Sequence, residues 1–289
     1  VGTAIMQRPA RTPALCAMTA MSLNQLSGGR FIVGLGASGP QVVEGWHGVP
    51  YGKPVTRTRE YIKIMRAIME RSGPVEFDGE MYQMPNTGEG TTGLGKPLKS
   101  ILEGAPDIPI YTASITPAGL RCAGEVADGV FPVWMDPGKY DILGEHIEAG
   151  FDKAGGGKSL KDFDIAPFVT AAPNDDLDAA FDALRPYLAL YIGGMGARDK
   201  NFYNDYATRL GYGDAAKKIQ DLYLEGKKDE ACALVPNELI DEVCLVGSHD
   251  RIRDRLARWK EAGQRGEVGS MLLAVSDPAV MELFAKELL

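Results

Sequence analysis

Short apolar runs alternate with helix-like segments along most of this 289-residue chain. Because each run is apolar throughout, it is typical of a strand buried on both faces of a parallel sheet that helices cover. We predict six such strands, at residues 1–6, 31–35, 108–113, 130–133, 165–171 and 270–275. The pattern is compatible with an open doubly wound sheet or a (β/α)8 barrel, and a barrel requires eight strands.

The segments between these strands have helical periodicity. Pro13, Pro117 and Pro278 stand at predicted helix starts, where the missing N–H of proline costs little. We predict helices at residues 13–26, 56–71, 117–126, 139–154, 175–191 and 278–288, and an almost wholly helical stretch at 201–262.

Residues 73–107 lack a helical period and form a predicted insertion. Asp78-Gly79 predicts a β-hairpin turn between strands at 74–77 and 81–84. Because the insertion lies between a helix and the next strand, a barrel would place it on the face opposite the active site. We therefore interpret it as a structural plug or a partner surface.

Charge and cysteine usage restrict the class of protein. A net charge of −8 and a pI near 5.1 argue against a nucleic-acid surface. Four cysteines, far apart and without a CxxC pair, indicate buried thiols of a cytoplasmic protein. No segment has the length and apolarity of a membrane span, and the three histidines have no metal-ligand spacing. We expect a cytoplasmic protein without a metal and without a membrane partner.

A glycine-rich loop follows the second predicted strand, with Gly34, Gly36 and Gly39. Glycines let backbone N–H groups approach a ligand closely, but a tight turn after a strand explains them as well. Pro40 and the lack of a clear acidic partner argue against a dinucleotide-binding fingerprint. Trp46-His47 follows this loop, so His47 is either a general acid or base or a structural histidine.

Two further features suggest an anionic ligand. Ser114 and Thr116 precede a predicted helix, whose first N–H groups can bind an anion or be capped by these side chains. Lys53, Arg57 and Arg59 lie at a helix start, where cations oppose the helix dipole, so helix stability does not explain them. They indicate either a bound anionic ligand or ordinary solvated surface residues.

Trp134 stands at the end of a predicted strand. Its side chain either lines a ligand pocket or fills space in the core.

Several motifs together resemble the luciferase-like monooxygenase superfamily, specifically its deazaflavin-dependent oxidoreductase branch. They run over nearly the whole chain, at residues 1–6, 11–13, 26–31, 34–45, 57–61, 127–129, 190–196 and 201–203. The resemblance implies an α/β (β/α)8 TIM barrel of the bacterial luciferase type. It implies a single domain over 1–289 made of strands 3 to 8, with the first two βα units missing. The segment 73–107 is then a hairpin-containing insertion, and about 193–246 a helical one.

The resemblance also implies a cofactor site. A non-prolyl cis peptide between Ala4 and Ile5 would lie behind the deazaflavin ring of the cofactor, and the loop after the next strand would border that ring. Some relatives carry glycines where this chain has Ile115 and Thr116, and family members take an acidic or histidine catalytic group from a second-strand region that this sequence does not contain. The catalytic residue is thus unknown, with His47 a candidate by position. The cofactor-binding residues implied are Ala4, Ile5, Gly36, Ala37, Ser38, Gly39, Gln41 and Val42 around the ring, and Ser114, Ile115 and Thr116 around the phosphate.

We therefore expect an oxidoreductase that transfers a hydride between coenzyme F420 and a small organic substrate. Lys53, Arg57 and Arg59 favour F420 because its polyglutamate tail is acidic. The alternatives are an FMN-dependent monooxygenase of the same superfamily and a non-catalytic barrel that binds flavin or deazaflavin. The resemblance further implies a homodimer.

Overall fold

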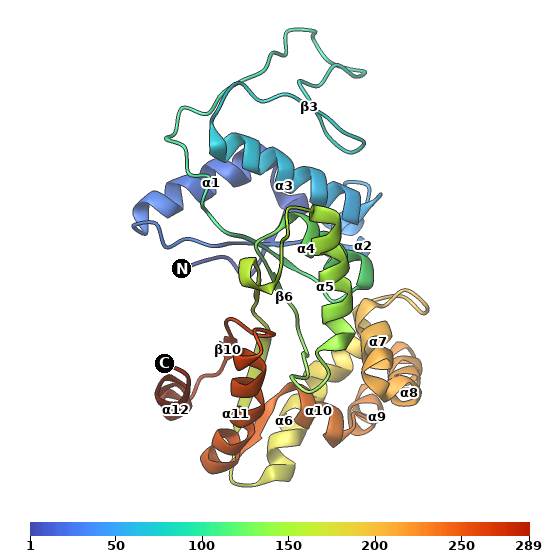
Figure 1. Cartoon of the computed structure of the whole chain (residues 1–289). Helices are drawn as coiled ribbons and strands as arrows, with labels where there is room; N and C mark the ends of the chain where they lie inside the picture. The colour runs from blue at the N-terminus through green and yellow to red at the C-terminus, as the bar shows by residue number, and fades with distance from the viewer. The chain divides into compact units, whose positions relative to one another are not determined.

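The computed structural model describes residues 1–289, and the chain divides into two compact units (Figure 1). The first unit comprises Val1–Ser114, Ala118–Val130 and Ala149–Gly157. The second comprises Ile115–Pro117, Phe131–Glu148 and Lys158–Leu289. Both are built from short parallel strands and helices, as the apolar runs predict.

Parallel strands form the centre of the first unit. β1 (Met6–Gln7), β2 (Val33–Gly36), β5 (Ile110–Ala113) and the beginning of β6 (Gly129–Phe131) are hydrogen-bonded in that order. Gly36 of β2 is paired with Gln7 on one side and with Ala113 on the other. The carboxyl ends of these three strands therefore meet at one edge, where the following loops are brought together.

Helices α1 (Pro13–Leu26) and α3 (Pro54–Glu70) pack against each other beside these strands (Figure 1). The Thr12 side chain caps α1 by accepting a hydrogen bond from the N–H of Leu15 at 3.2 Å. Their shared core includes Cys16, Tyr61 and Met65, all fully buried. The other helical segments here are η1 (Arg8–Ala10), α2 (Pro40–Gly45), α4 (Pro117–Val126) and the end of α5 (Asp141–Ala154).

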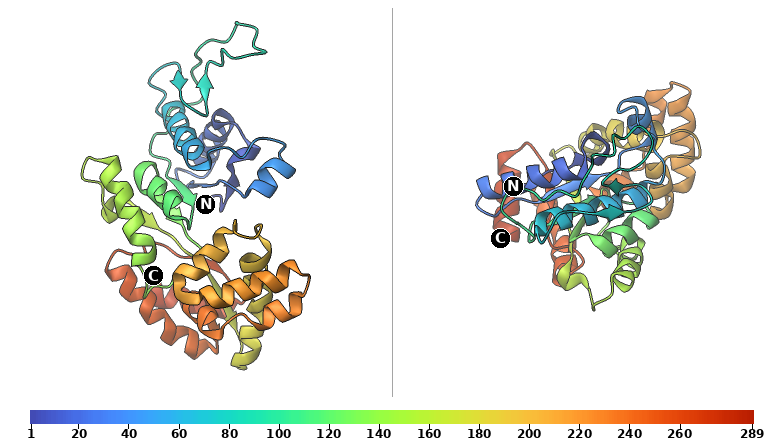
Figure 2. Two further views of the ribbon diagram at one scale, coloured as in Figure 1. Left: turned by 90° about the vertical axis from the view of Figure 1, so that its right-hand side faces the viewer. Right: turned by 90° about the horizontal axis from the view of Figure 1, so that it is seen from above.

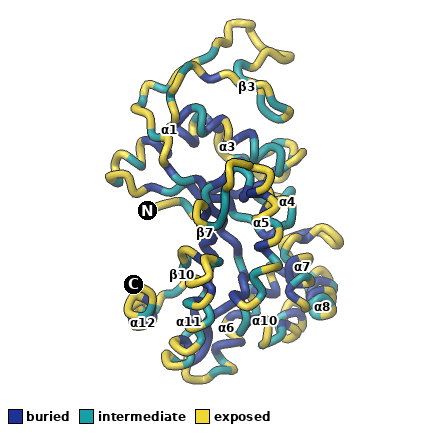
Figure 3. The backbone as a smooth tube through the Cα atoms, viewed as in Figure 1, coloured by how far each residue is buried: buried dark blue, intermediate teal, exposed yellow.

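The insertion contains a hairpin of β3 (Phe77–Asp78) and β4 (Gln83–Met84), drawn as two arrows next to α3 in Figure 2. Its turn spans 79–82, with the Gly79 N–H donating to the Tyr82 carbonyl at 2.9 Å, so Asp78 is in the strand and not in the turn. The N–H groups of Glu80, Met81 and Tyr82 all donate to the Glu60 carboxylate, at 2.8, 2.8 and 3.0 Å. Most of the insertion is exposed or half-buried (Figure 3).

The hairpin tip lies near the start of α3 and not at its end. Glu80 forms an ion pair with Lys53, the residue that precedes α3. Since α3 starts on the side where β2 ends, the tip reaches that side of the first unit. The prediction that this insertion lies wholly on the opposite face is therefore wrong for the tip, because the buried Glu60 carboxylate draws the turn back along α3.

In the second unit, β8 (Phe168–Pro173) lies between β10 (Leu272–Ala274) and β9 (Leu245–Gly247) in a parallel sheet. The stretch predicted as helical from 201 to 262 thus contains β9, a three-residue buried strand too short to show a period. The unit also contains β7 (Asp164–Ile165), η2 (Leu160–Asp162), α6 (Leu177–Ala189), η3 (Leu190–Gly194), α7 (Phe202–Ala207), η4 (Thr208–Tyr212), α8 (Gly213–Leu224), α9 (Lys228–Ala233), α10 (Asn237–Val243), α11 (His249–Gln264) and α12 (Pro278–Leu288).

The proline-led helices α1, α4 and α12 begin and end at the predicted residues. The first predicted strand is shorter than expected, because only Met6–Gln7 form regular strand pairs, preceded by a single bridge between Gly2 and Ile32. No helix combines the length and apolarity that crossing a membrane requires.

Candidate cofactor site

The strand edge of the first unit carries an exposed apolar platform made by Ala4 and Ile5. The peptide bond between them is cis, as the resemblance implies. Ile5 is 36% exposed, and its side chain occupies the space in front of Gly36. A Cβ atom on Gly36 would lie 1.8 Å from Ile5 Cδ1, so this position accepts no side chain while Ile5 stays in place. A side chain at this position would have to displace the end of the Ile5 side chain.

The glycine loop leaves this edge next to the platform. Ser38 has a φ of 60°, in the left-handed region that non-glycine residues rarely adopt. The Gly39 carbonyl accepts the N–H groups of Val42 and Val43 at 3.1 and 3.0 Å and so begins α2. Ala37, Ser38, Gly39 and Val42 are half-buried, whereas Gln41 is exposed. The structure thus brings the ring-binding residues implied by the resemblance to one edge.

His47 reaches the same edge. Its Nε2 lies 2.9 Å from Oε1 of Gln7, the strand residue paired with Gly36. Its backbone N–H donates to the Val42 carbonyl at 3.1 Å. His47 is half-buried, whereas the adjacent Trp46 is 84% exposed. His47 therefore has a hydrogen-bond partner, Gln7, that the sequence did not identify.

The three cations at the start of α3 differ in what they contact. Arg59 donates to Glu125 at 2.9 Å, and Lys53 pairs with Glu80. Arg57 has no acidic partner and donates to the Pro50 carbonyl at 3.2 Å. Two of the three cations are thus neutralised within the protein, and only Arg57 keeps a charge for a ligand.

The second unit holds the turn that follows β5. Ile115 is buried, and its carbonyl accepts a hydrogen bond from Nη2 of Arg209 in η4. Nη1 of Arg209 lies 3.5 Å from the Ile142 carbonyl, and the guanidinium lies over the Tyr206 ring at 4.9 Å from its centroid. Burial lowers the pKa of Arg209, which forms no salt bridge. A cation near the start of α4 opposes the helix dipole, so helix stability does not account for it.

Trp134 belongs to the same network. Its carbonyl accepts a 3.1 Å hydrogen bond from the Tyr206 hydroxyl, whose pKa burial raises. The indole is only 2% exposed and packs against Tyr187, Tyr191 and Tyr203, with ring centroids 6.2, 6.0 and 5.5 Å away. Of the two interpretations of Trp134, the structure supports the one in which it fills space.

No group of three or more His, Cys, Asp or Glu side chains gathers in a way that would hold a metal ion. The platform, the loop and the turn after β5 instead offer apolar surface and backbone. An exposed apolar patch at a strand edge fits a planar ring, and an unpaired arginine beside a helix start fits a phosphate.

Comparison with known proteins assigns the family. The sequence model of the luciferase-like monooxygenase family matches residues 1–266. A Mycobacterium tuberculosis protein named "Putative coenzyme F420-dependent oxidoreductase Rv3520c" is 45% identical over 264 residues, which cover 91% of this chain and 76% of that protein. The chain belongs to the luciferase-like monooxygenase family.

More distant relatives support the same family assignment. The 5,10-methylenetetrahydromethanopterin reductase of Archaeoglobus fulgidus is 27% identical over 280 residues, covering 96% of this chain and 78% of the enzyme. The solved F420-dependent tetrahydromethanopterin reductase of Methanopyrus kandleri superposes with a TM-score of 0.73 at 26% identity, covering 99% and 81% of the two chains. The fold is the α/β fold of the luciferase-like TIM barrels, as predicted.

Proposed function

We propose that this chain is an oxidoreductase that uses coenzyme F420 to transfer a hydride to or from a small organic substrate. The observation that carries the proposal is the Ala4–Ile5 platform held over Gly36 beside the glycine loop. The 45% identical mycobacterial relative, which is named for the same coenzyme, supports this choice of cofactor.

Each part of the site has a task in this function. Ala4 and Ile5 back the ring, while the loop from Gly36 to Gly39, with Gln41 and Val42, borders it. Ser114, Ile115 and Thr116 hold the phosphate through backbone groups. When bound, the deazaflavin supplies two-electron hydride chemistry, and the protein supplies orientation and exclusion of water.

His47 is the candidate for proton transfer. Reduction of a carbonyl by hydride requires a proton at its oxygen, and a histidine can deliver one near neutral pH. If Nε2–H donates to the Gln7 amide oxygen 2.9 Å away, Nδ1 is left to exchange a proton with the substrate. Gln7 then fixes the orientation of the His47 imidazole.

Titration of the purified chain with F420, FMN and riboflavin tests the cofactor. We expect saturable F420 binding at micromolar concentration, followed by turnover with an alcohol, aldehyde or enone. FMN binding with oxygen consumption and no F420 binding would establish the monooxygenase instead. F420 binding without turnover over this substrate set would indicate a non-catalytic binding protein.

A further inference from the structure

Arg8 is a buried cation with unused hydrogen-bond donors. It follows β1 directly, at the strand edge that carries Gln7 and His47. The residue is only 2% exposed, and its Nε and Nη1 atoms are buried without any hydrogen-bond partner. Burial lowers the pKa of Arg8, with a smaller opposing effect from Tyr82. Unpaired buried charge is strongly unfavourable, so such a residue is rarely kept for stability alone.

Arg57 adds a second positive charge to this place. Its charge acts on Arg8 and further lowers the pKa of that guanidinium. The Nε atom of Arg57 is likewise buried without a partner. The two arginines thus have three buried donor nitrogens without a partner in the first unit.

No carboxylate compensates these charges. The groups that act on Arg8 are Tyr82, Arg57 and Tyr61, none of them acidic at neutral pH. Glu60 lies one turn after Arg57 on α3, but its carboxylate accepts three N–H groups of the hairpin turn. Burial raises the pKa of both Tyr61 and Tyr82, so neither hydroxyl becomes an anion. The surroundings of Arg8 and Arg57 therefore lack a negative charge that would balance the two guanidinium groups.

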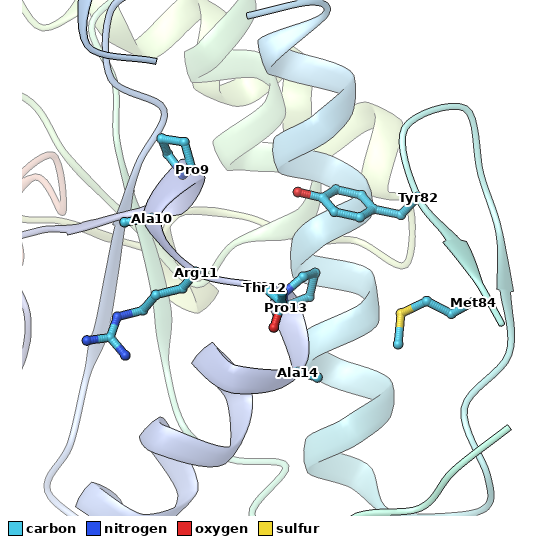
Figure 4. Close-up of a pocket in the computed structure, with 8 residues that line it drawn as sticks. All are labelled: Pro9, Ala10, Arg11, Thr12, Pro13, Ala14, Tyr82 and Met84. Atoms are coloured by element: carbon cyan, nitrogen blue, oxygen red, sulfur yellow. The ribbon is translucent and has the colours of Figure 1, made fainter. Parts of the chain in front are cut away.

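Tyr82 connects this pair of arginines to a cavity. Tyr82 acts electrostatically on Arg8 and raises its pKa, and its ring lines a cavity of about 540 Å³ together with Pro9, Thr12 and Met84 (Figure 4). Figure 4 shows the ring of Tyr82 extending from the hairpin strand that also carries Met84. Arg8 itself does not line the cavity, whereas its sequence neighbour Pro9 and Tyr82 do.

We propose that Arg8 and Arg57 form a binding site for an anionic oxygen group, a carboxylate or a phosphate, whose ligand enters through this cavity and replaces Tyr82 on Arg8. Guanidinium groups suit such ligands because they offer several N–H donors in one plane. Arg8 directly follows Gln7, the hydrogen-bond partner of His47, so the site adds an anion-recognising element next to the end of β1. The anion comes from the substrate or from the acidic tail of the cofactor.

Thermal unfolding of the full chain in sodium phosphate or sodium acetate tests the site, with sodium chloride at equal ionic strength as reference. We expect phosphate or acetate to raise the unfolding midpoint in a saturable manner, and Arg8→Met or Arg57→Met to abolish the rise. Arg30→Met, which removes an exposed arginine of the same unit, is the control and should keep the anion-induced rise of the midpoint. The Arg8→Met chain without anion should unfold a few degrees higher than wild type, because an uncompensated buried charge is gone.

A purely structural Arg8 gives the opposite result, since Arg8→Met would then lower the midpoint and leave the anion effect unchanged. Tyr82→Phe provides a test that does not require an arginine variant. It removes the hydroxyl that competes for Arg8, so phosphate or acetate affinity should rise several-fold. Unchanged or weaker affinity in Tyr82→Phe, or no saturable anion effect in wild type, overturns the site. None of these measurements uses F420, so their failure is distinct from failure of the proposed cofactor.

The source of the anion follows from cofactor fragments, and this part depends on the proposed function. F420 carries a phosphate and a polyglutamate tail, whereas its ring fragment lacks both. If Arg8→Met weakens F420 about tenfold and leaves the ring fragment unchanged, the anion is the cofactor's. If F420 and the ring fragment both bind Arg8→Met as tightly as wild type, and only the KM of carboxylate substrates rises, the anion belongs to the substrate.

Discussion

The guanidinium of Arg209 donates a hydrogen bond to the carbonyl of Ile115, joining η4 to the turn between β5 and α4 across 94 residues of sequence. Tyr206 lies against the guanidinium and bonds in turn to the Trp134 carbonyl after β6. One arginine thus fixes the backbone of the proposed phosphate turn and brings an unpaired positive charge next to it.

Replacing Arg209 by methionine should weaken phosphate-bearing cofactors selectively. Loss of a hydrogen bond to a charged group is worth about 1.5–3 kcal/mol, which corresponds to roughly a 10- to 100-fold loss of affinity. Titration with F420 and with its phosphate-free ring fragment measures this, and only F420 should lose affinity. Arg198→Met, which removes an exposed arginine paired with Asp221, is the control. Equal loss for both ligands would show a general structural defect.

Replacing Gly36 by alanine should disturb the ring platform. The new Cβ lies 1.8 Å from Ile5 Cδ1, so Ile5 has to move away. Forced overpacking costs about 1–3 kcal/mol of stability, and we expect weaker binding of F420 and of its ring fragment alike. Gly45→Ala is the control, because its Cβ meets no atom within 4 Å. Ring-fragment affinity that survives Gly36→Ala would place the ring elsewhere.

Replacing His47 by alanine should affect turnover and leave cofactor binding intact. Removal of a positioned general acid or base lowers kcat by about 10²- to 10⁴-fold. Steady-state kinetics and F420 titration on the same preparation separate the two effects. His249→Asn, which changes a histidine near Asp277, should leave both unchanged. A kcat within twofold of wild type in His47→Ala would leave the proton donor unassigned.

Local patterns predicted most of the long-range parallel strands, the proline-led helices and the loops that follow β2 and β5, but they missed β9. They failed where long-range contacts determine the burial and the partners of a side chain. Arg8 is a single arginine after an apolar run, and only the fold buries it without an acid. Glu60 and Arg209 look like ordinary helix-surface charges until the hairpin turn and the Ile115 carbonyl come to meet them. Residue types one, three or four positions apart carry no record of such partners.

Replacing Glu60 by alanine should loosen the hairpin. Three backbone N–H groups then lose a charged acceptor, at a cost of about 2–4 kcal/mol after partial rescue by water. Limited proteolysis should show new cleavage at residues 79–82, and the free energy of unfolding should fall. Glu80→Gln breaks only the exposed pair with Lys53, so its effect should stay under about 1 kcal/mol. Unchanged protease resistance in Glu60→Ala would mean that the strands alone hold the turn.

Glu125 should contribute to stability in a pH-dependent way. Burial acts to raise the pKa of Glu125, but hydrogen bonds from Lys153 and Arg59, at 2.8 and 2.9 Å, bring it below its ordinary value of 4.5. Because the folded-state pKa is depressed, the stabilisation is present above pH 4.5 and is lost as the pH falls through the folded-state pKa. Urea unfolding in this acidic range should show a shallower pH dependence for Glu125→Gln than for wild type. The exposed variant Glu89→Gln should keep the wild-type slope, and an equally steep slope in Glu125→Gln would assign the acid sensitivity to other carboxylates.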